Sequence, residues 1–184
     1  MANNTANVST GKPKIAGAVY RAPLGTTIPT DSVTALDAAF VALGYVSEDG
    51  VTNANDSDTT EIKAWGGDTV YTTHEDVTDT FEMTFIEAMN EEVLKAYFGD
   101  DNVTGALATG ITITANRTDP VNSIWVIDMI LNGNATKRIV IPNGAVTGRG
   151  EISYVDSEVI GYNVTITAQP DASGNTHYEY IKAA

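Results

Sequence analysis

Two histidines are the first candidates for catalysis or metal binding in this chain. An imidazole can act as a general base or hold a metal near neutral pH, but each role needs partners at short spacing. His74 and His177 lack such partners in the sequence, and no serine is flanked by the glycines of a nucleophile elbow. We therefore expect two surface histidines and no enzyme activity.

Two further segments carry chemistry-bearing residue types. The run Asn53 to Asp58 is rich in oxygen ligands, but it lacks the sixth-place glycine and twelfth-place glutamate of an EF-hand, which leaves at most an opportunistic divalent site. The spaced glycines from Gly144 to Gly150 lack the lysine and hydroxyl residue of a phosphate loop and indicate a turn. The sequence predicts no cofactor and no metal centre.

The charge of the chain limits its partners. The net charge is −14, and only ten lysines and arginines stand against 24 acidic residues. Affinity for nucleic acid comes mainly from basic groups that release counterions, so adhesion to DNA or RNA is not expected; the charge can equally serve only to keep the protein in solution. The chain has no cysteine, no signal-peptide pattern and no apolar run of membrane-spanning length, so we expect a soluble protein with no membrane partner.

One stretch, from Val77 to Gly99, indicates the elements that position the rest. Apolar and polar residues alternate along Thr78 to Phe85, which is typical of a strand with one buried face. A short helix is predicted next, from an N-cap at Asn90 to a stop at Gly99. With the apolar strand Ile124 to Leu131, these elements give the expected core residues Phe81, Met83, Phe85, Leu94, Phe98 and Trp125.

The remaining pattern is one of short strands and turns. The first strand is expected after Pro13 with Ile15, Ala18, Val19 and Tyr20, and helical turns at Thr34 to Phe40. Later strands are expected at Ile111 to Ala115, Ser123 to Leu131, Thr136 to Ile141, Glu151 to Tyr154 and Tyr162 to Ala168. Asp49-Gly50, Asn132-Gly133 and Asn143-Gly144 are predicted turns, and Asp100 to Gly110 a polar loop.

The fold class predicted from this pattern is mainly β: an antiparallel β-sandwich or barrel-like domain with one or two short flanking α-helices. The expected organisation is a flexible arm over residues 1–12, a domain over 13–170 and a C-terminal segment over 171–184.

A long polar segment interrupts the strands. Residues 48–61 are almost devoid of large apolar side chains and must be a loop or a solvent-exposed hairpin. Trp65 follows it, either as a loop anchor or as an aromatic interface residue. A connection of this length in a compact domain is a functional candidate.

Several of these signals occur in an order that resembles a known family. Leu36 to Phe40, Gly44-Tyr-Val-Ser-Glu-Asp-Gly50, Trp65-Gly-Gly67 and Thr80 to Glu87 followed by Asn90 to Gly99 are similar to the major tail protein of long, non-contractile-tailed bacteriophages. The resemblance runs from about Lys14 to Ala168. It implies a tail-tube β-sandwich that forms stacked hexameric rings around a tape-measure protein, meets tail terminator and tail-tip proteins, and later conducts DNA without binding it specifically.

The resemblance also implies roles for residues. It places the subunit in the virion tail, with host cytoplasm as the site of assembly, and makes the arm over residues 1–12 a second assembly element. The long segment becomes the contact between rings, through Glu48, Asp49, Asp56, Asp58, Glu61 and Trp65.

An acidic, threonine-rich wall suits a DNA conduit, because like charge keeps the duplex away from it. The expected lumen-facing residues are Thr80, Glu82, Thr84, Asn163, Thr165 and Thr167. A rival class, a non-polymerising adhesin-like or carbohydrate-binding β-sandwich, would need an exposed aromatic platform, for which Tyr178 and Tyr180 are weak candidates.

Overall fold

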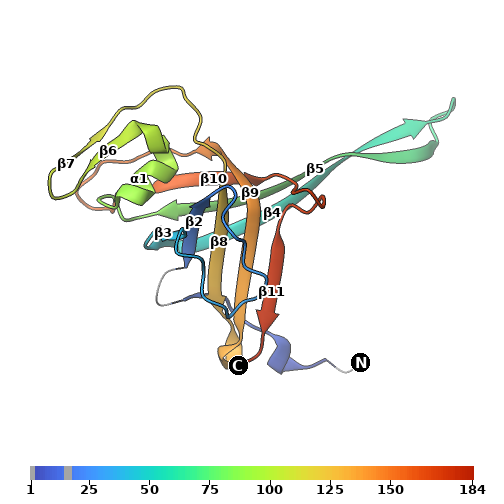
Figure 1. Ribbon diagram of the computed structural model, residues 1–184. Helices are drawn as coiled ribbons and strands as arrows, with labels where there is room; N and C mark the ends of the chain where they lie inside the picture. Colours follow the sequence, from blue (N-terminus) through green and yellow to red (C-terminus); the bar gives the residue numbers. More distant parts are fainter. Residues whose placement is uncertain (1–2, 15–17) are drawn as a thin grey trace.

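A computed structural model describes residues 3–14 and 18–184 (Figure 1). It is mainly antiparallel β with one α-helix in the described part, which confirms the fold class expected from the sequence. The strands are β1 (Lys12–Pro13), β2 (Val19–Pro23), β3 (Val41–Ala42), β4 (Val46–Lys63), β5 (Thr69–Phe85), β6 (Val103–Ala106), β7 (Gly110–Ile113), β8 (Ser123–Ile130), β9 (Thr136–Arg149), β10 (Tyr162–Ala168) and β11 (Tyr178–Lys182). The helical segments are α1 (Glu91–Phe98) and three short 3₁₀ turns, η1 (Thr5–Asn7), η2 (Asp100–Asn102) and η3 (Asn132–Asn134).

Within residues 3–14 and 18–184, nine strands form one sheet in the order β3-β2-β8-β9-β10-β5-β4, with β1 added to β8 and β11 added to β9. Strand β9 connects two parts of the sheet, because its first half pairs with β11 and its second half pairs with β10. The change falls at Pro142 to Gly144, where the pairing with β8 also shifts register. The sheet therefore changes direction within one continuous strand.

This bend corrects the predicted turn at Asn143-Gly144. A Cβ on Gly144 would lie 2.6 Å from the indole of Trp125 and 2.8 Å from Ile166. The glycine is required for close packing of backbone against the Trp125 ring, so Asn-Gly here lies within a strand. The other predicted turn, Asn132-Gly133, does connect β8 to β9, with both Gly133 and Asn134 at positive φ.

The two faces of the sheet bury different clusters. One contains Trp125 and Ile127 of β8 with the inward residues of β5, β9 and β10 and the apolar face of α1. The other, smaller cluster contains Ile124, Val126 and Val140, covered by the loop 24–40 and by β11. Because β8 is apolar on both faces, it is the central strand that its sequence predicts.

The ends of the chain join the same sheet. Among the described residues of the first arm, Lys12 and Pro13 pair with Ile130 and Met129. Asn132 holds the arm through hydrogen bonds to Ser9 Oγ and the Val8 carbonyl, both of 2.8 Å. Val19 and Tyr20 lie in β2, whereas the expected strand residue Ile15 lies outside the described residues.

The helix α1 has the boundaries that its capping residues predict. The side chain of Asn90 accepts a hydrogen bond from Glu92 N at 3.0 Å, and Gly99 ends the helix at φ 98°. Lys95 forms ion pairs with Glu91 and Glu92 one turn before it. The helix lies beside the small β6–β7 sheet. The segment 100–110, predicted to be a loop, is partly structured, because it contains η2, β6 and the first residue of β7.

Two other predicted elements are absent from their places. Residues 34–40 form turns rather than a helix, because the Asp37 carboxylate accepts from Ala39 N and the Thr34 carbonyl accepts from Arg138, so neither backbone group is used in helical pairing. Residues 151–154 are not a strand, since they lie in the projecting connection 150–161, where they meet no pairing partner. The apolar alternation there was too short to decide between strand and loop.

Candidate assembly interface

The polar segment after Val46 is a solvent-exposed hairpin, which is one of the two structures that the sequence allows, and not a loop. Strand β4 runs without a break from Val46 to Lys63 and pairs with β5 almost to its start. Gly50 is not a turn residue, because it lies inside β4 at φ 72°, within a register shift between Val46 and Val51. Figure 1 shows the β4–β5 ribbon leaving the body of the molecule and ending in a free tip.

The ribbon is long compared with the body. At about 3.4 Å per residue, a strand of the length of β5 spans roughly 55 to 60 Å. Only its second half, from Asp79 to Phe85, contacts the core, while the first half pairs with β4 alone. A two-stranded ribbon that packs on no core cluster gains little stability by itself, and its edges are open to contact with another chain.

The tip of the ribbon carries exposed apolar side chains, which we call the tip patch: Ile62, Trp65, Val70 and Tyr71. Ile62 and Tyr71 are direct cross-strand partners, so their side chains lie on one face. Trp65 lies in the turn and is fully exposed, so it does not anchor the loop in the single subunit, and its role as an aromatic interface residue stays a prediction.

Acidic side chains flank the tip patch along both strands. Between residues 48 and 82 there are ten acidic residues and one basic residue, Lys63. The predicted contact residues Glu48, Asp49, Asp56, Asp58 and Glu61 all lie on β4 and are exposed. The structure thus brings the six predicted inter-ring residues onto one ribbon, but only Trp65 lies at the apolar tip.

The base of the ribbon is clamped by a buried carboxylate that the sequence reasoning did not single out. Asp79 is 1% exposed and accepts hydrogen bonds from Asn53 Nδ2 and Thr176 Oγ1, each at 2.7 Å, while His177 Nδ1 lies 2.5 Å away. Burial raises the pKa of the Asp79 carboxyl, but the bonds from Thr176, His177 and Asn53 outweigh it and hold the pKa below its ordinary value.

This clamp corrects the expectation for one histidine. His177 is not a free surface residue, because it bonds Asp79 and packs edge-on against Phe81, with ring centroids 5.3 Å apart. The side chain of His74 lies outside what the structure describes. The clamp ties the C-terminal segment to β5 where the ribbon leaves the body.

The predicted lumen residues share one polar face on β5 and β10. The register pairs Thr80 with Thr167, Glu82 with Thr165 and Thr84 with Asn163. Asn163 Nδ2 donates to Glu82 Oε1 and Thr84 Oγ1, both at 3.1 Å. The structure therefore places all six on one face, where Asn163, Glu82 and Thr84 are linked by hydrogen bonds; Glu82 is exposed and the other five are half-buried in the single subunit.

The six residues expected in the core have the following exposures. Phe81, Met83, Phe85, Leu94 and Trp125 are each 3% exposed or less, and Phe98 is half-buried at the edge of the cluster. Phe98 packs with Tyr97 and Tyr162 in edge-on aromatic contacts.

A buried ion pair holds the loop 24–40 on the opposite face of the sheet. Arg138 donates to both oxygens of Asp128, at 2.6 and 2.8 Å, and also to the carbonyls of Asp31 and Thr34. The bonds to Asp128 raise the pKa of the guanidinium. The signal in the sequence was Asp128 itself, the one charged residue in an apolar strand.

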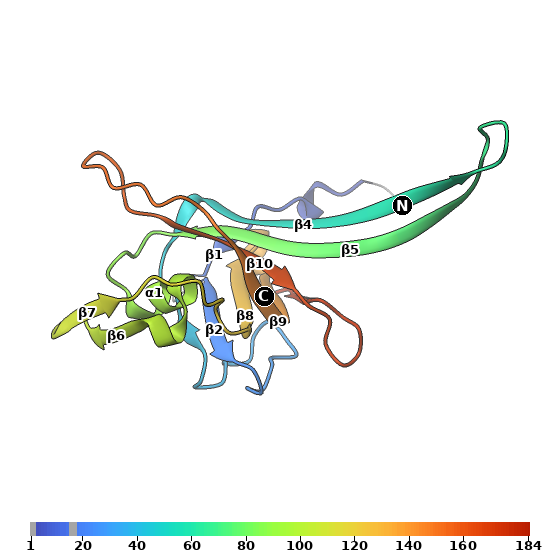
Figure 2. The ribbon, with the colours of Figure 1, turned by 90° about the horizontal axis from the view of Figure 1, so that it is seen from above.

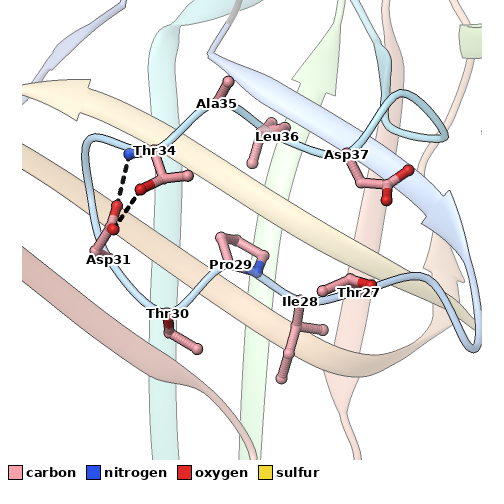
Figure 3. Close-up of a pocket in the computed structure, with 9 residues that line it drawn as sticks. All are labelled: Thr27, Ile28, Pro29, Thr30, Asp31, Thr34, Ala35, Leu36 and Asp37. Carbon is pink, nitrogen blue, oxygen red and sulfur yellow. Dashed lines mark hydrogen bonds between the residues drawn. The ribbon is translucent and has the colours of Figure 1, made fainter.

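Figure 3 shows the open cup that this loop encloses, lined by residues 27–31 and 34–37, with a volume of about 320 Å³. Asp31 accepts bonds from Val33 N, Thr34 N and Thr34 Oγ1, which lower its pKa to about 2. The Asp31 carboxylate is already hydrogen-bonded within the loop, and the residues that line the cup include no basic side chain. The cup therefore results from how the loop folds and gives no evidence of a ligand site.

The described residues contain no metal-binding cluster and no membrane-spanning helix. No three His, Asp or Glu side chains in residues 3–14 and 18–184 converge as a metal-binding group. The one α-helix in the described part is too short to cross a lipid bilayer. The aromatic pair Tyr178 and Tyr180 is stacked and half-buried against the smaller cluster, so it offers a poor platform for sugar binding.

A β-rich body with a projecting ribbon, an apolar tip and a polar threonine face has the features of a structural subunit that works by assembly. The family model described as phage tail tube protein matches residues 1–184, and the chain belongs to this family. It is a structural component of the phage tail in the virion.

Two other comparisons complete this result. The solved structure of the cap that terminates the tube of the anti-feeding prophage is similar to this chain. The alignment covers 100% of both chains at 9% sequence identity, with a TM-score of 0.44. The search of curated proteins found no match.

Proposed function

We propose that this chain assembles into hexameric rings, that the rings stack into the tail tube, and that the tube conducts DNA during ejection. The observation that carries the proposal is the β4–β5 ribbon, which extends well beyond the subunit and ends in exposed aromatic and aliphatic side chains. Such a patch has no role in a lone soluble subunit, since exposed Trp and Tyr at a projecting tip favour association.

The arms support stacking in this proposal. The ribbon projects about 35 Å beyond the clamp at Asp79, counting ten residues of extended chain, so it can cross from one ring to the next. Residues 3–11 are exposed in the subunit and can add a second contact, as expected of a terminal arm.

The threonine face of β5 and β10 is proposed to line the bore. Its groups are hydroxyls, an amide and the carboxylate of Glu82, with no lysine or arginine among them. A wall without lysine or arginine displaces no counterions from the DNA, and the Glu82 carboxylates repel the phosphates, so DNA can pass without binding.

The remaining partners follow from a tube of this kind. The tape-measure protein fills the bore before DNA, terminator and tip proteins close the two ends, and assembly takes place in host cytoplasm. The role of the chain is structural, with no catalytic step.

A reconstruction of the assembled protein tests the proposal. Electron microscopy of the purified chain should reveal rings or tubes with six subunits per ring, and the face of Thr80, Thr165 and Thr167 should lie toward the axis. Persistent monomers at high concentration would refute the assembly, and a bore lined by another face would refute the assignment of the wall.

A further inference from the structure

We propose that the tip patch of one copy docks into an apolar pocket at the opposite end of a second copy, formed by residues 86–90 together with Val159 and Ile160. The inference rests on the proposed stacking and names the site that receives the ribbon. The occupant is a second copy of this chain.

The pocket is an open depression with a mostly apolar lining, and it is large enough to admit an aromatic side chain. Its volume is about 620 Å³, and Met89 and Val159 at its edge are each 70% exposed. The carboxylate of Glu87 is already used, because it accepts from Tyr45 N and Asn90 Nδ2, both at 2.9 Å. A large apolar side chain can enter without stranding a free carboxylate.

The positions of patch and pocket make an internal contact impossible. The pocket begins at Ile86, directly after the last residue of β5, whereas the tip patch lies at the first residues of the same strand. Figure 2 shows the free tip at one extreme of the ribbon and the connection 150–161, which contributes Val159, at the other. The full length of β5 separates the two within one subunit.

A projection and a pocket on different surfaces of one chain define a head-to-tail contact. Such a contact does not close on itself in pairs, and each added copy offers a new free tip and a new free pocket. Repetition of such a contact gives either a closed ring or an open stack along one axis, and the open stack is the geometry that a tube requires.

The chemistry of the two surfaces matches. The tip patch supplies Trp65 with the cross-strand pair Ile62 and Tyr71, and the pocket supplies aliphatic and thioether groups that pack well on aromatic rings. Lys63, the one basic residue of the ribbon, lies two positions before Trp65, and the exposed Glu158 adjoins Val159. Lys63 lies 3.8 Å from Glu61 in the free subunit, and both side chains are exposed, so its ammonium group can also meet Glu158 of a second copy.

One such contact is small compared with a stable protein interface of about 1,600 Å². It becomes strong when several copies in one ring engage the next ring together, because every contact after the first is intramolecular. Single subunits would then bind one another weakly, while rings stack firmly.

Crosslinking tests the contact, because the chain has no cysteine of its own. Ala64→Cys places a thiol beside Trp65 and leaves the indole intact, while Val159→Cys places one at the pocket. The two single variants are mixed, allowed to assemble and treated with a short bismaleimide, and the products are identified by mass spectrometry of the linked peptides. Val121→Cys is the matched control, since Val121 is similarly exposed but lies outside the pocket.

The expected result is a covalent dimer joining position 64 to position 159 in assembled material, and none above background with position 121. Tubes that form without this dimer, or equal linkage to position 121, would overturn the inference and leave the proposed function standing. If the unmodified chain forms no tubes, the proposed function itself fails.

A charge exchange gives a second readout that does not depend on cysteines. Lys63→Glu should reduce assembly at low ionic strength, and Glu158→Lys in the same chain should restore it. Loss without restoration, or no loss at all, would place the tip against some other surface.

Discussion

Strand β5 runs through two regions that differ in burial: its second half lies in the core of the body, and its first half lies in the exposed ribbon. Its second half is the buried centre of the larger cluster, where Phe81, Met83 and Phe85 are all 2% exposed or less. Its first half has exposed neighbours on both faces, and Tyr71 there is 62% exposed. The body buries its apolar side chains in the core, whereas the ribbon exposes them to solvent.

The border between the regions is the clamp at Asp79. On the tip side of Asp79, residues 69–78 of β5 pair with β4. On the other side, residues 80–85 also pair with β10 and lie in the body. The clamp fixes the direction in which the ribbon leaves, because Thr176 and His177 approach it from the C-terminal segment. Folding and assembly can therefore be disturbed separately by substitutions on one strand.

The largest expected effect comes from Phe85→Ala. Phe85 is fully buried, so the substitution should lower the free energy of unfolding by about 3 to 5 kcal/mol. Chemical denaturation measures it, with Tyr71→Ala as the control on the same strand, expected to change stability by about 0.5 kcal/mol or less. Equal losses for the two variants would remove the distinction between body and ribbon.

Arg138→Ala should rank next. It leaves the Asp128 carboxylate buried and releases the loop 24–40 from the sheet, at a cost of about 3 to 5 kcal/mol. The paired change Arg138→Met with Asp128→Leu should recover most of this loss, since neither charge then remains buried without a partner. Failure to recover would mean that the loop contacts, and not the ion pair, carry the effect.

The clamp should show a smaller effect that depends on pH. Asp79→Asn is expected to cost about 1 to 3 kcal/mol at neutral pH, because it weakens three hydrogen bonds to a buried carboxylate. The folded-state pKa of Asp79 is depressed, so its stabilisation is present above the unfolded pKa of about 4 and is lost as pH falls through the folded pKa. Denaturation from pH 7 to pH 3 should bring the variant and the parent closer together; a gap that widens would reverse the sign.

The smallest effect on stability is expected from shortening the ribbon. Ser57 and Val77 are cross-strand partners, so residues 58–76 can be replaced by Asn-Gly in a two-residue turn. The free energy of unfolding should change by about 1 kcal/mol or less, because the removed residues lie outside both clusters. A protein that no longer folds would make the ribbon part of the body.

How far the sequence predicted the molecule depends on which region is considered. In the body, the alternation from Phe81 to Phe85 and the caps Asn90 and Gly99 gave the right strand and helix, because one face of each is buried. In the ribbon both faces are exposed, so periodicity carries no information, and the sequence of β4 does not decide between a loop and a hairpin.

Other elements were beyond local signals. The strand through Asn143-Gly144 depends on Trp125 packing against the glycine, a contact distant in sequence. The clamp joins Asp79 to Thr176 and His177, nearly a hundred residues away. The local sequence indicates a turn at Asn143-Gly144 and a surface position for His177, and tertiary packing overrides both interpretations.

The most direct measurement is electron microscopy of the intact chain beside the chain shortened at Ser57 and Val77, at matched concentration and with matched folding. The intact chain should form stacked tubes, and the shortened chain should remain as single rings or subunits, because it lacks the tip patch. Tubes of equal length from both chains would contradict the claim that the β4–β5 ribbon joins successive rings.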